Sequence, residues 1–440
     1  MNKEPLFPFP VNIPPESMKG VKKKRFLHKV EVIKNLYAFG PTSNADICKR
    51  LRISMPTSLS IMNELLEIRM VEKWGHGVSS GGRKPVLFGL MSDSFFSLGI
   101  DVTRFKTRIA IYNNCNKKVS ETISFTSDIT KPEECVDKIY NNASELLENA
   151  SIDTTKLICV GLIMPGLIDS GRGINYTHLN FGSKTTREVL EEKFNRPVFI
   201  ENDAKAMAHA ELRFGKALGK KNVLVVFMEW GLGLGVIIEG KIYRGSLGLA
   251  GELSHIPAID NKIYCQCGKQ GCLETIASGA AISRMAIEGI SSGKRSVLAE
   301  YHEKKGGHIE TGEVVEAANS GDLFAISILS DTGMNLGKGL ASLMQLFNPE
   351  LVILSGNVCE AKQYITTPVQ QALNTYCMPQ IRERTNIVIS ELGDDQGMLG
   401  AVSLAIEYFF ERPFSWNFYK KATTVYDQKN ETVEENKVNV

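Results

Sequence analysis

Three cysteines and a histidine crowd into one short stretch of this 440-residue chain, and they constrain its local fold more than any other feature. Cys265, Cys267 and Cys272 lie within eight positions, and His255 lies ten residues before the first of them. The other six of the nine cysteines are scattered, which does not suggest a disulfide framework. Thiolate and imidazole are ligands that Zn²⁺ prefers in structural sites. The cluster predicts such a site, with buried free thiols as the alternative.

Two glycines between these cysteines favour a tight loop. Gly268 and Gly271 allow the backbone to curl around a metal ion. A Cys₃His set would fill all four positions of a tetrahedral zinc, so no position is left open for a reactive water. We therefore expect a structural metal without a hydrolytic role.

Length and composition indicate a globular protein of two or three domains. The chain is 43% hydrophobic and 23% charged. It has neither an apolar N-terminal run that would suit a signal peptide nor about 18 consecutive apolar residues that would suit a membrane span. We expect a cytoplasmic protein that does not enter a membrane.

The charge is unevenly distributed. Residues 1–90 contain 15 Lys or Arg and 7 Asp or Glu, a net charge of +8, whereas the remaining 350 residues carry −6. A basic head on an acidic body favours contact between the head and a polyanion, although an ordinary solvated surface would also explain it.

The head shows the pattern of a winged helix-turn-helix over residues 21–90. Helical periodicity runs to about residue 39, and two further helices are predicted over about 44–51 and 56–69. Two strand-like segments then flank a basic, Gly-rich hairpin. In such a unit the second helix of the helix-turn-helix enters the major groove and the wing reaches the backbone or the minor groove. The alternative is a small helical domain for protein contacts.

The third predicted helix should bury Leu59, Met62 and Leu66 and turn short polar side chains outward. Such side chains can approach base edges, and basic groups on the wing can neutralise phosphates. The residues predicted to bind double-stranded operator DNA are Thr57, Ser58, Ser60, Asn63, Arg83 and Lys84.

The rest of the chain alternates strands with helices, which is typical of α/β architecture. Two comparable strand clusters over residues 91–410 suggest two lobes with a cleft. Residues 1–20 are Pro-rich and residues 411–440 are largely polar, so we expect a disordered N-terminus and a C-terminal tail.

Four stretches of the body resemble the ROK family of sugar kinases and repressors: MPGLIDSGRGI, FIENDAKAMAHAE, GLAGELSHIPAIDNKIYCQCGKQGCLE and GDDQGMLGAVSLA. The resemblance covers nearly all of residues 20–410, and the cysteine stretch is its most specific part. It implies a two-lobed body of the actin-like, hexokinase-like ATPase fold. With the head, it implies a regulator similar to the family's xylose-, glucose- and N-acetylglucosamine-responsive repressors, acting as a homodimer or homotetramer.

The resemblance also implies a sugar site. Its hydrogen-bonding side chains would be those of Asn202, Asp203, Glu252, His255 and Glu274, with Asn180 as a weaker candidate. Carboxylate, imidazole and amide groups suit sugar hydroxyls, which both donate and accept hydrogen bonds. For Glu252 and Glu274 the alternative is a capping role. His255 can serve both metal and sugar only if each ring nitrogen takes one partner.

The phosphate-binding loops depart from the family pattern. Asp203 matches the general base of ROK kinases, but the first loop, usually Asp-x-Gly-Gly-Thr, reads DVTRF at 101–105. The second, usually Gly-Thr-Gly-x-Gly, reads EWGLG at 229–233. Without these glycines and with a carboxylate among them, the loops should not cradle ATP phosphates.

The sequence therefore predicts a non-enzymatic, sugar-responsive DNA-binding regulator, most simply a repressor of carbohydrate-use genes. Its effector would be a small sugar or a sugar phosphate. Two alternatives remain. One is an ATP-dependent sugar kinase, such as a glucokinase or N-acetylhexosamine kinase, with an extra N-terminal domain; the other is a protein-interaction module.

Overall fold

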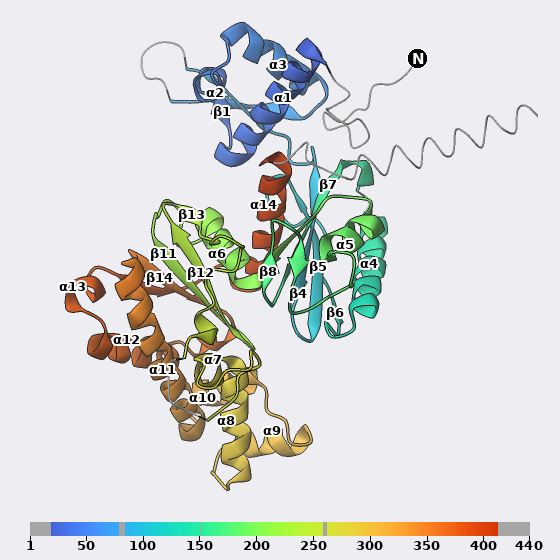
Figure 1. Ribbon diagram of the computed structural model, residues 1–440. Coiled ribbons are helices and arrows are strands. Elements are labelled where there is room, and N and C mark those ends of the chain that lie inside the picture. Colours follow the sequence, from blue (N-terminus) through green and yellow to red (C-terminus); the bar gives the residue numbers. More distant parts are fainter. Residues whose placement is uncertain (1–18, 79–83, 151, 258–261, 412–440) are drawn as a thin grey trace, which may run out of the picture. The chain divides into compact units, whose positions relative to one another are not determined.

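The computed structural model (Figure 1) describes residues 19–78, 84–150, 152–257 and 262–411. The chain divides into two compact units. The chain passes between them four times. Unit 1 comprises Met1–Ile163, Gly173–Ile200 and Ala401–Val440, whereas unit 2 comprises Met164–Arg172 and Glu201–Gly400.

The head forms the predicted winged helix-turn-helix as part of unit 1. Its helices are α1 (Gly20–Phe39), α2 (Asn44–Leu51) and α3 (Met55–Glu67). Its antiparallel sheet has the order β1 (Thr42–Ser43), β3 (Val86–Leu90) and β2 (Val71–His76). Ser43 and Ser54 are the N-caps of α2 and α3, because each hydroxyl accepts the backbone N–H of the residue three positions later. Arg83 and most of the wing tip lie outside the described residues.

The predicted orientation of α3 is wrong in part. Met62 is buried as expected, but Leu59 is 44% exposed, while Ser58 and Ile61 are completely buried. Ser58 turns inward because its hydroxyl donates a 2.6 Å hydrogen bond to Oδ1 of Asn44. A buried polar group with a partner costs little, so a serine can replace an apolar side chain on this face. Ser58 is therefore not available for base contacts.

The body of unit 1 is built on a five-stranded sheet covered by helices. The strands are, in spatial order, β10 (Val198–Asn202), β7 (Leu157–Met164), β4 (Phe96–Val102), β5 (Lys106–Asn113) and β6 (Ile123–Thr126). Strands β4 and β7 are parallel, whereas β5 pairs with β4 and β6 in antiparallel fashion. The helices are α4 (Pro132–Asn149), α5 (Thr186–Phe194) and most of α14 (Gln396–Glu411). Strand β4 is buried throughout, as expected for a central strand.

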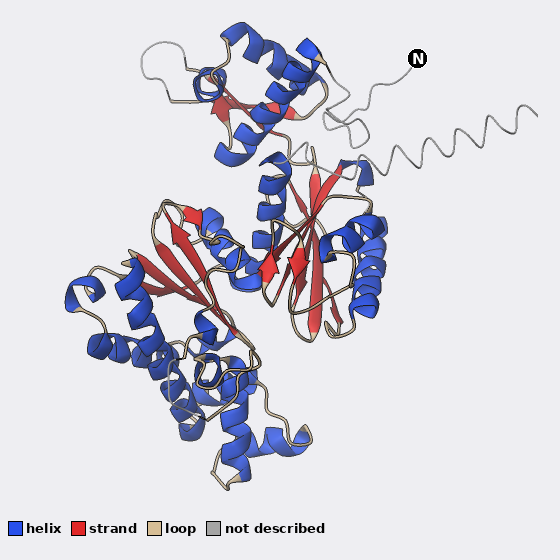
Figure 2. Cartoon of the chain, in the orientation of Figure 1, coloured by secondary structure: helices blue, strands red, loops and turns tan. Residues whose placement is uncertain are grey.

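Unit 2 holds a second five-stranded mixed sheet (Figure 2). Its strands are, in order, β13 (Lys241–Ile242), β12 (Leu232–Ile238), β11 (Val223–Met228), β14 (Leu351–Ser355) and β15 (Asn386–Ile389). Its helices are α6 (Asp203–Phe214), α7 (Glu274–Ala277), α8 (Gly279–Ser291), α9 (Leu298–Lys304), α10 (Thr311–Asn319), α11 (Leu323–Phe347), α12 (Gln363–Tyr376) and α13 (Pro379–Arg382). Two short strands, β8 (Ile168–Asp169) and β9 (Ile174–Asn175), form a separate two-stranded sheet.

The two similar sheets confirm the predicted α/β body with two lobes. Parallel pairs β11–β14 and β14–β15 are joined by helical segments, as such connections require. Among the described residues, no helix is both long and apolar enough to cross a lipid bilayer.

Candidate metal and sugar site

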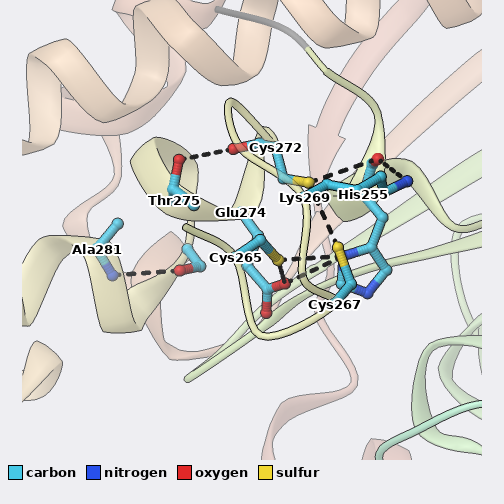
Figure 3. Close-up of polar contacts among 9 residues, drawn as sticks. His255, Cys265, Cys267, Lys269, Cys272, Glu274, Thr275 and Ala281 are labelled. Carbon is cyan, nitrogen blue, oxygen red and sulfur yellow. Dashed lines mark hydrogen bonds and ion pairs between the residues drawn. The ribbon is translucent and has the colours of Figure 1, made fainter. Parts of the chain in front are cut away.

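The cysteine loop lies in unit 2 between a short 3₁₀ helix, Leu253–His255, and α7 (Figure 3). Two hydrogen bonds close its tip: Cys265 N–H donates to Lys269 O at 2.8 Å, and Gly268 N–H donates to Cys265 O at 2.9 Å. Gly268 and Gly271 have φ values of 85° and 76°, a region that glycine adopts without strain. The glycines thus allow the turn that gathers the thiols.

The four predicted ligands converge. One ligand atom from each of His255, Cys265, Cys267 and Cys272 lies within 4.8 Å of the other three. Cys265 Sγ is 3.4 Å from His255 Nδ1, and Cys267 Sγ is 3.6 Å from Cys272 Sγ. In a tetrahedron with Zn–S of about 2.3 Å and Zn–N of about 2.0 Å, ligand atoms stand roughly 3.5–3.8 Å apart. The residues present therefore fit a structural zinc ion.

The surroundings of Cys265 oppose the ionisation of its thiol when no cation is bound. Burial raises the pKa of the Cys265 thiol to about 12, with the Glu274 carboxylate acting in the same direction. A thiol in such surroundings does not ionise alone at neutral pH, whereas a bound divalent cation stabilises the thiolate.

Glu274, one of the predicted sugar residues, contacts the cluster of cysteines and His255. It is the first residue of α7, and its Oε2 lies 3.4 Å from both His255 Nδ1 and Cys265 Sγ. Glu252 lies three residues before His255. Burial raises the pKa of the Glu252 carboxyl, with Glu274 acting in the same direction, while Lys205 and His255 oppose the shift. Glu252 makes no capping hydrogen bond at the 3₁₀ helix that it precedes, so the capping alternative has no support there.

Asn202 and Asp203 stand at the start of α6. The Asn202 side chain accepts the Lys205 N–H at 3.3 Å and donates to Gly166 O at 3.2 Å, which fixes its orientation. Asp203 Oδ1 accepts the N–H of Ala204 at 2.8 Å. A helix N-terminus also favours negative charge, which suits a carboxylate at this position.

Asn180 belongs to unit 1, whereas the other predicted sugar residues belong to unit 2. It is exposed, and its Oδ1 accepts the Gly182 N–H at 2.9 Å. Its participation in a sugar site with the residues of unit 2 stays a prediction.

Lys205 is a neighbour of these residues that the sequence analysis missed. Its side chain is only 2% exposed, and burial lowers its pKa against the opposing influence of Glu201, Glu252 and Asp203. Glu201 in turn accepts a 3.0 Å hydrogen bond from Arg244 Nε. The sequence feature that could have indicated Lys205 is its position as a charged residue in the first turn of α6, an alanine-rich helix.

In the segment 101–105, where the family resemblance predicts the first phosphate loop, Asp101 forms an ion pair. It is buried in β4, and its Oδ2 lies 2.5 Å from Nη2 of Arg108 on the paired strand β5. Burial raises the pKa of Asp101, and Arg108 opposes that shift. The carboxylate therefore already has a cation as its partner.

In the segment 229–233, where the resemblance predicts the second phosphate loop, Glu229 is hydrogen-bonded to Asn357. Its carboxylate accepts the backbone N–H of Asn357 at 3.1 Å and the Asn357 Nδ2 at 2.7 Å. The loop backbone contacts the start of α8, where Gly279 N–H donates to Glu229 O and Ala280 N–H donates to Trp230 O. These N–H groups at a helix start would suit an anion, but carbonyl oxygens occupy them. Asn357 lies 128 residues from Glu229, and no sequence pattern indicated it.

On the head, the remaining DNA candidates lie at the surface. Asn63 and Lys84 are exposed, and Thr57 and Ser60 are half-buried. Ser60 accepts a 2.7 Å hydrogen bond from Arg25 of α1, which also pairs with Glu64. A basic side chain of α1 thus lies beside the polar face of α3, which the sequence analysis did not anticipate.

Comparison with known proteins agrees with this architecture. The model of the ROK family matches residues 97–408. The chain is 29% identical to the xylose repressor of Bacillus spizizenii over 90% of its own length and 97% of the repressor. It is 32% identical to the glucokinase of Halalkalibacterium halodurans over 70% of its length and 94% of that enzyme. A crystal structure of a ROK family transcriptional regulator, a homologue of the E. coli MLC protein, superposes with a TM-score of 0.73 at 25% identity, covering 88% of this chain and 97% of that one. The chain therefore belongs to the ROK family.

Proposed function

We propose that this protein is a sugar-responsive DNA-binding transcriptional regulator, most simply a repressor of carbohydrate-use genes. One contrast within unit 2 carries the proposal. The candidate hydroxyl-binding groups around His255 and Glu274 are gathered, whereas Glu229, where a phosphate loop is expected, is held by Asn357. A protein that binds a sugar without a phosphate donor can sense it but cannot phosphorylate it.

The zinc ion would orient the sugar site. His255 faces the cysteines through Nδ1, so its Nε2 is the nitrogen left for a sugar hydroxyl. Zinc held by Cys265, Cys267, Cys272 and His255 supplies rigidity and fixes the imidazole. Glu252, Glu274, Asn202 and Asp203 would accept or donate the remaining hydroxyl hydrogen bonds, and Asn180 is a further candidate for a hydroxyl contact.

The head would bind the operator. In helix-turn-helix dimers the second helix reads the major groove, and paired half-sites are spaced by one helical turn or its multiples. Thr57, Ser60 and Asn63 on α3 would approach base edges, while Lys84 and Arg83 on the wing would contact phosphates. A homodimer or homotetramer would supply the paired heads. DNA binding and thiolate ligands both suit a cytoplasmic location.

The curated relatives support the non-enzymatic function. The xylose repressor aligns with the head as well as the body, whereas the glucokinase aligns over 70% of this chain. The second candidate is a sugar kinase, favoured by Asp203 at the position of the family's general base and by the 32% identity to the glucokinase. In that reading the chain would phosphorylate a sugar with ATP.

Fluorescence anisotropy tests the proposal. The purified chain is titrated onto labelled DNA from upstream of its own gene, at fixed salt, with and without xylose, glucose, N-acetylglucosamine and the 6-phosphates of the two hexoses. Tight binding that one of these sugars releases supports the regulator. Binding that never exceeds the level of random DNA, together with ATP-dependent sugar phosphorylation, would favour the kinase.

A further inference from the structure

Helix α14 belongs to both units. The boundary between them falls between Gly400 and Ala401, four residues after the first residue of the helix. The chain has three other crossings, and none of them lies inside a helix. A continuous helix is stiff on this length scale, so its two ends must move together.

The first turn of α14 is fixed to α6 in unit 2. Gln396 is 4% exposed, and its Nε2 donates to Met207 O at 3.3 Å and to Glu211 at 3.2 Å. Its Oε1 accepts a 2.5 Å hydrogen bond from Ser355 of β14. One turn later, a Cβ on Gly400 would lie 2.2 Å from Ala206 O, so the backbones of the two helices approach closely.

The next residue is fixed to unit 1. A Cβ on Gly161 of β7 would lie 2.3 Å from Ala401 O. Gly400 and Ala401 are therefore each in close backbone contact with a neighbouring element. Gly400 contacts α6 of unit 2, and the Ala401 carbonyl contacts β7 of unit 1. Neither contact leaves space for α14 to slide along its axis, so a displacement of this stiff helix would be a rotation about Gly400–Ala401.

The far end of α14 reaches the DNA-binding head. The Phe410 ring lies 6.0 Å from the ring of Tyr37 on α1 and 6.0 Å from that of Phe95, and all three side chains are buried. Ala405 and Ile406 share this core with residues of the head. The Tyr37 hydroxyl adds a 2.9 Å hydrogen bond to Oδ1 of Asn116 in the body of unit 1.

The candidate sugar residues stand at the other end of this chain of contacts. Asn202 and Asp203 begin α6, and Ala206, Met207 and Glu211 of the same helix hold Gln396 and Gly400. A ligand that moves the start of α6 therefore acts on the first turn of α14.

We propose that α14 is the lever that carries the effector signal to DNA, with its fulcrum at Gly400–Ala401 and its output at the Phe410–Tyr37 contact. This inference rests on the proposed sugar-responsive function. Sugar binding shifts α6, α14 turns at the fulcrum, and Phe410 moves α1 and with it α3. Coupling of this kind works only if the sugar binds the two arrangements with different affinity.

The test separates coupling from binding. Gln396→Met keeps the volume but removes three hydrogen bonds at the input end, and Phe410→Leu reduces the aromatic contact at the output end. Operator affinity is measured by anisotropy with and without the sugar that releases the wild-type chain, chosen from xylose, glucose, N-acetylglucosamine and the two hexose 6-phosphates. Sugar affinity is measured by calorimetry. We expect both variants to bind sugar and operator within about threefold of wild type, while the effect of sugar on operator affinity falls from the roughly 5–150-fold typical of allosteric pairs to about twofold.

Val402→Ala is the matched control. It also removes buried volume from α14, next to Gly99, but Val402 is not part of the core shared with the head. It should keep the full sugar effect at a comparable loss of melting temperature. Tyr37→Phe is a milder variant at the contact between α14 and α1, because it retains the ring that packs on Phe410 and loses only the hydroxyl. If Gln396→Met and Phe410→Leu respond to sugar as the wild type does, the lever is refuted and the regulator stands. A wild-type chain whose DNA binding ignores every sugar tested would overturn the proposed function and the lever together.

Discussion

The carboxylate of Glu229 accepts two hydrogen bonds from Asn357, one from its backbone N–H at 3.1 Å and one from its side-chain amide at 2.7 Å. Hydrogen bonds to a charged acceptor are stronger than neutral ones. The contact joins the turn after β11 to the turn after β14 within unit 2. If a nucleotide phosphate were to approach these donors, the Glu229 carboxylate would oppose it by charge as well as by occupying them.

We therefore expect no kinase activity. With millimolar ATP and Mg²⁺, the wild-type chain should give no sugar-dependent ADP release above the background without protein, for xylose, glucose or N-acetylglucosamine. A coupled ADP assay measures this, and calorimetry with a non-hydrolysable ATP analogue should show no binding heat. Sugar-dependent turnover that disappears in Asp203→Asn would contradict the prediction and establish the kinase reading.

Removal of the metal should weaken sugar binding. Wild-type protein should contain one zinc per chain, and Cys272→Ser should lose it, as measured by elemental analysis. Without the ion the His255 imidazole is no longer oriented, so we expect sugar affinity to fall about tenfold, the loss of one well-placed hydrogen bond. The melting temperature should also decrease, because metal binding contributes to folding.

Cys115→Ser is the control for this experiment. Cys115 is exposed and lies outside the cluster, so this variant should keep both the zinc and the sugar affinity. Full zinc content in Cys272→Ser would show that the ion sits elsewhere.

Two substitutions on the head should affect DNA binding differently. Lys84→Ala removes an exposed cation from the wing, so we expect weaker binding to all sequences and a salt slope smaller by about 1. Arg83→Ala should behave in the same way. Asn63→Ala removes an exposed amide from α3 and should cost about 1–3 kcal/mol on the operator only.

Lys294→Ala provides the comparison, because Lys294 is an exposed cation of unit 2. It should leave operator affinity and salt slope unchanged. A loss of affinity for Lys84→Ala on one sequence alone would argue against a phosphate contact. Ser58→Ala should lower stability by about 1 kcal/mol through the lost bond to Asn44, without a change in operator preference.

Acid should destabilise the protein through His209. Burial lowers the pKa of this histidine from 6.5 to about 3, with Arg213 and Arg244 acting in the same direction. The unfolded chain therefore binds one more proton than the folded chain between these values. The contribution of His209 to stability is fully present above pH 6.5 and is lost as the pH falls toward 3, by up to about 1.4 kcal/mol per pH unit.

The difference in melting temperature between wild type and His209→Gln isolates this effect from other titrating groups. That difference should favour the wild type most at pH 7.5 and shrink or reverse by pH 5. A difference that does not change with pH would show that His209 is accessible to protons in the folded state.

Local patterns in the sequence predicted much of this protein. The spacing of Cys265, Cys267 and Cys272 with two glycines between them is enough to gather three thiols, because the contacts form within one loop. The helices and strands of the winged helix-turn-helix could likewise be predicted from the sequence, since N-caps and hydrophobic periodicity depend on only a few neighbouring residues. These features depend on interactions between near neighbours in the chain.

Tertiary structure decided the rest, because it joins residues that no pattern relates. Ser58 faces inward rather than toward DNA since Asn44, from the preceding helix, offers it a partner in the core. Glu229 meets Asn357 across 128 positions, and Phe410 meets Tyr37 across nearly the whole chain. The sequence by itself determined the family, the fold class and the metal loop. Which side chains are committed to one another, and how α14 is anchored, followed only from the packing of distant segments.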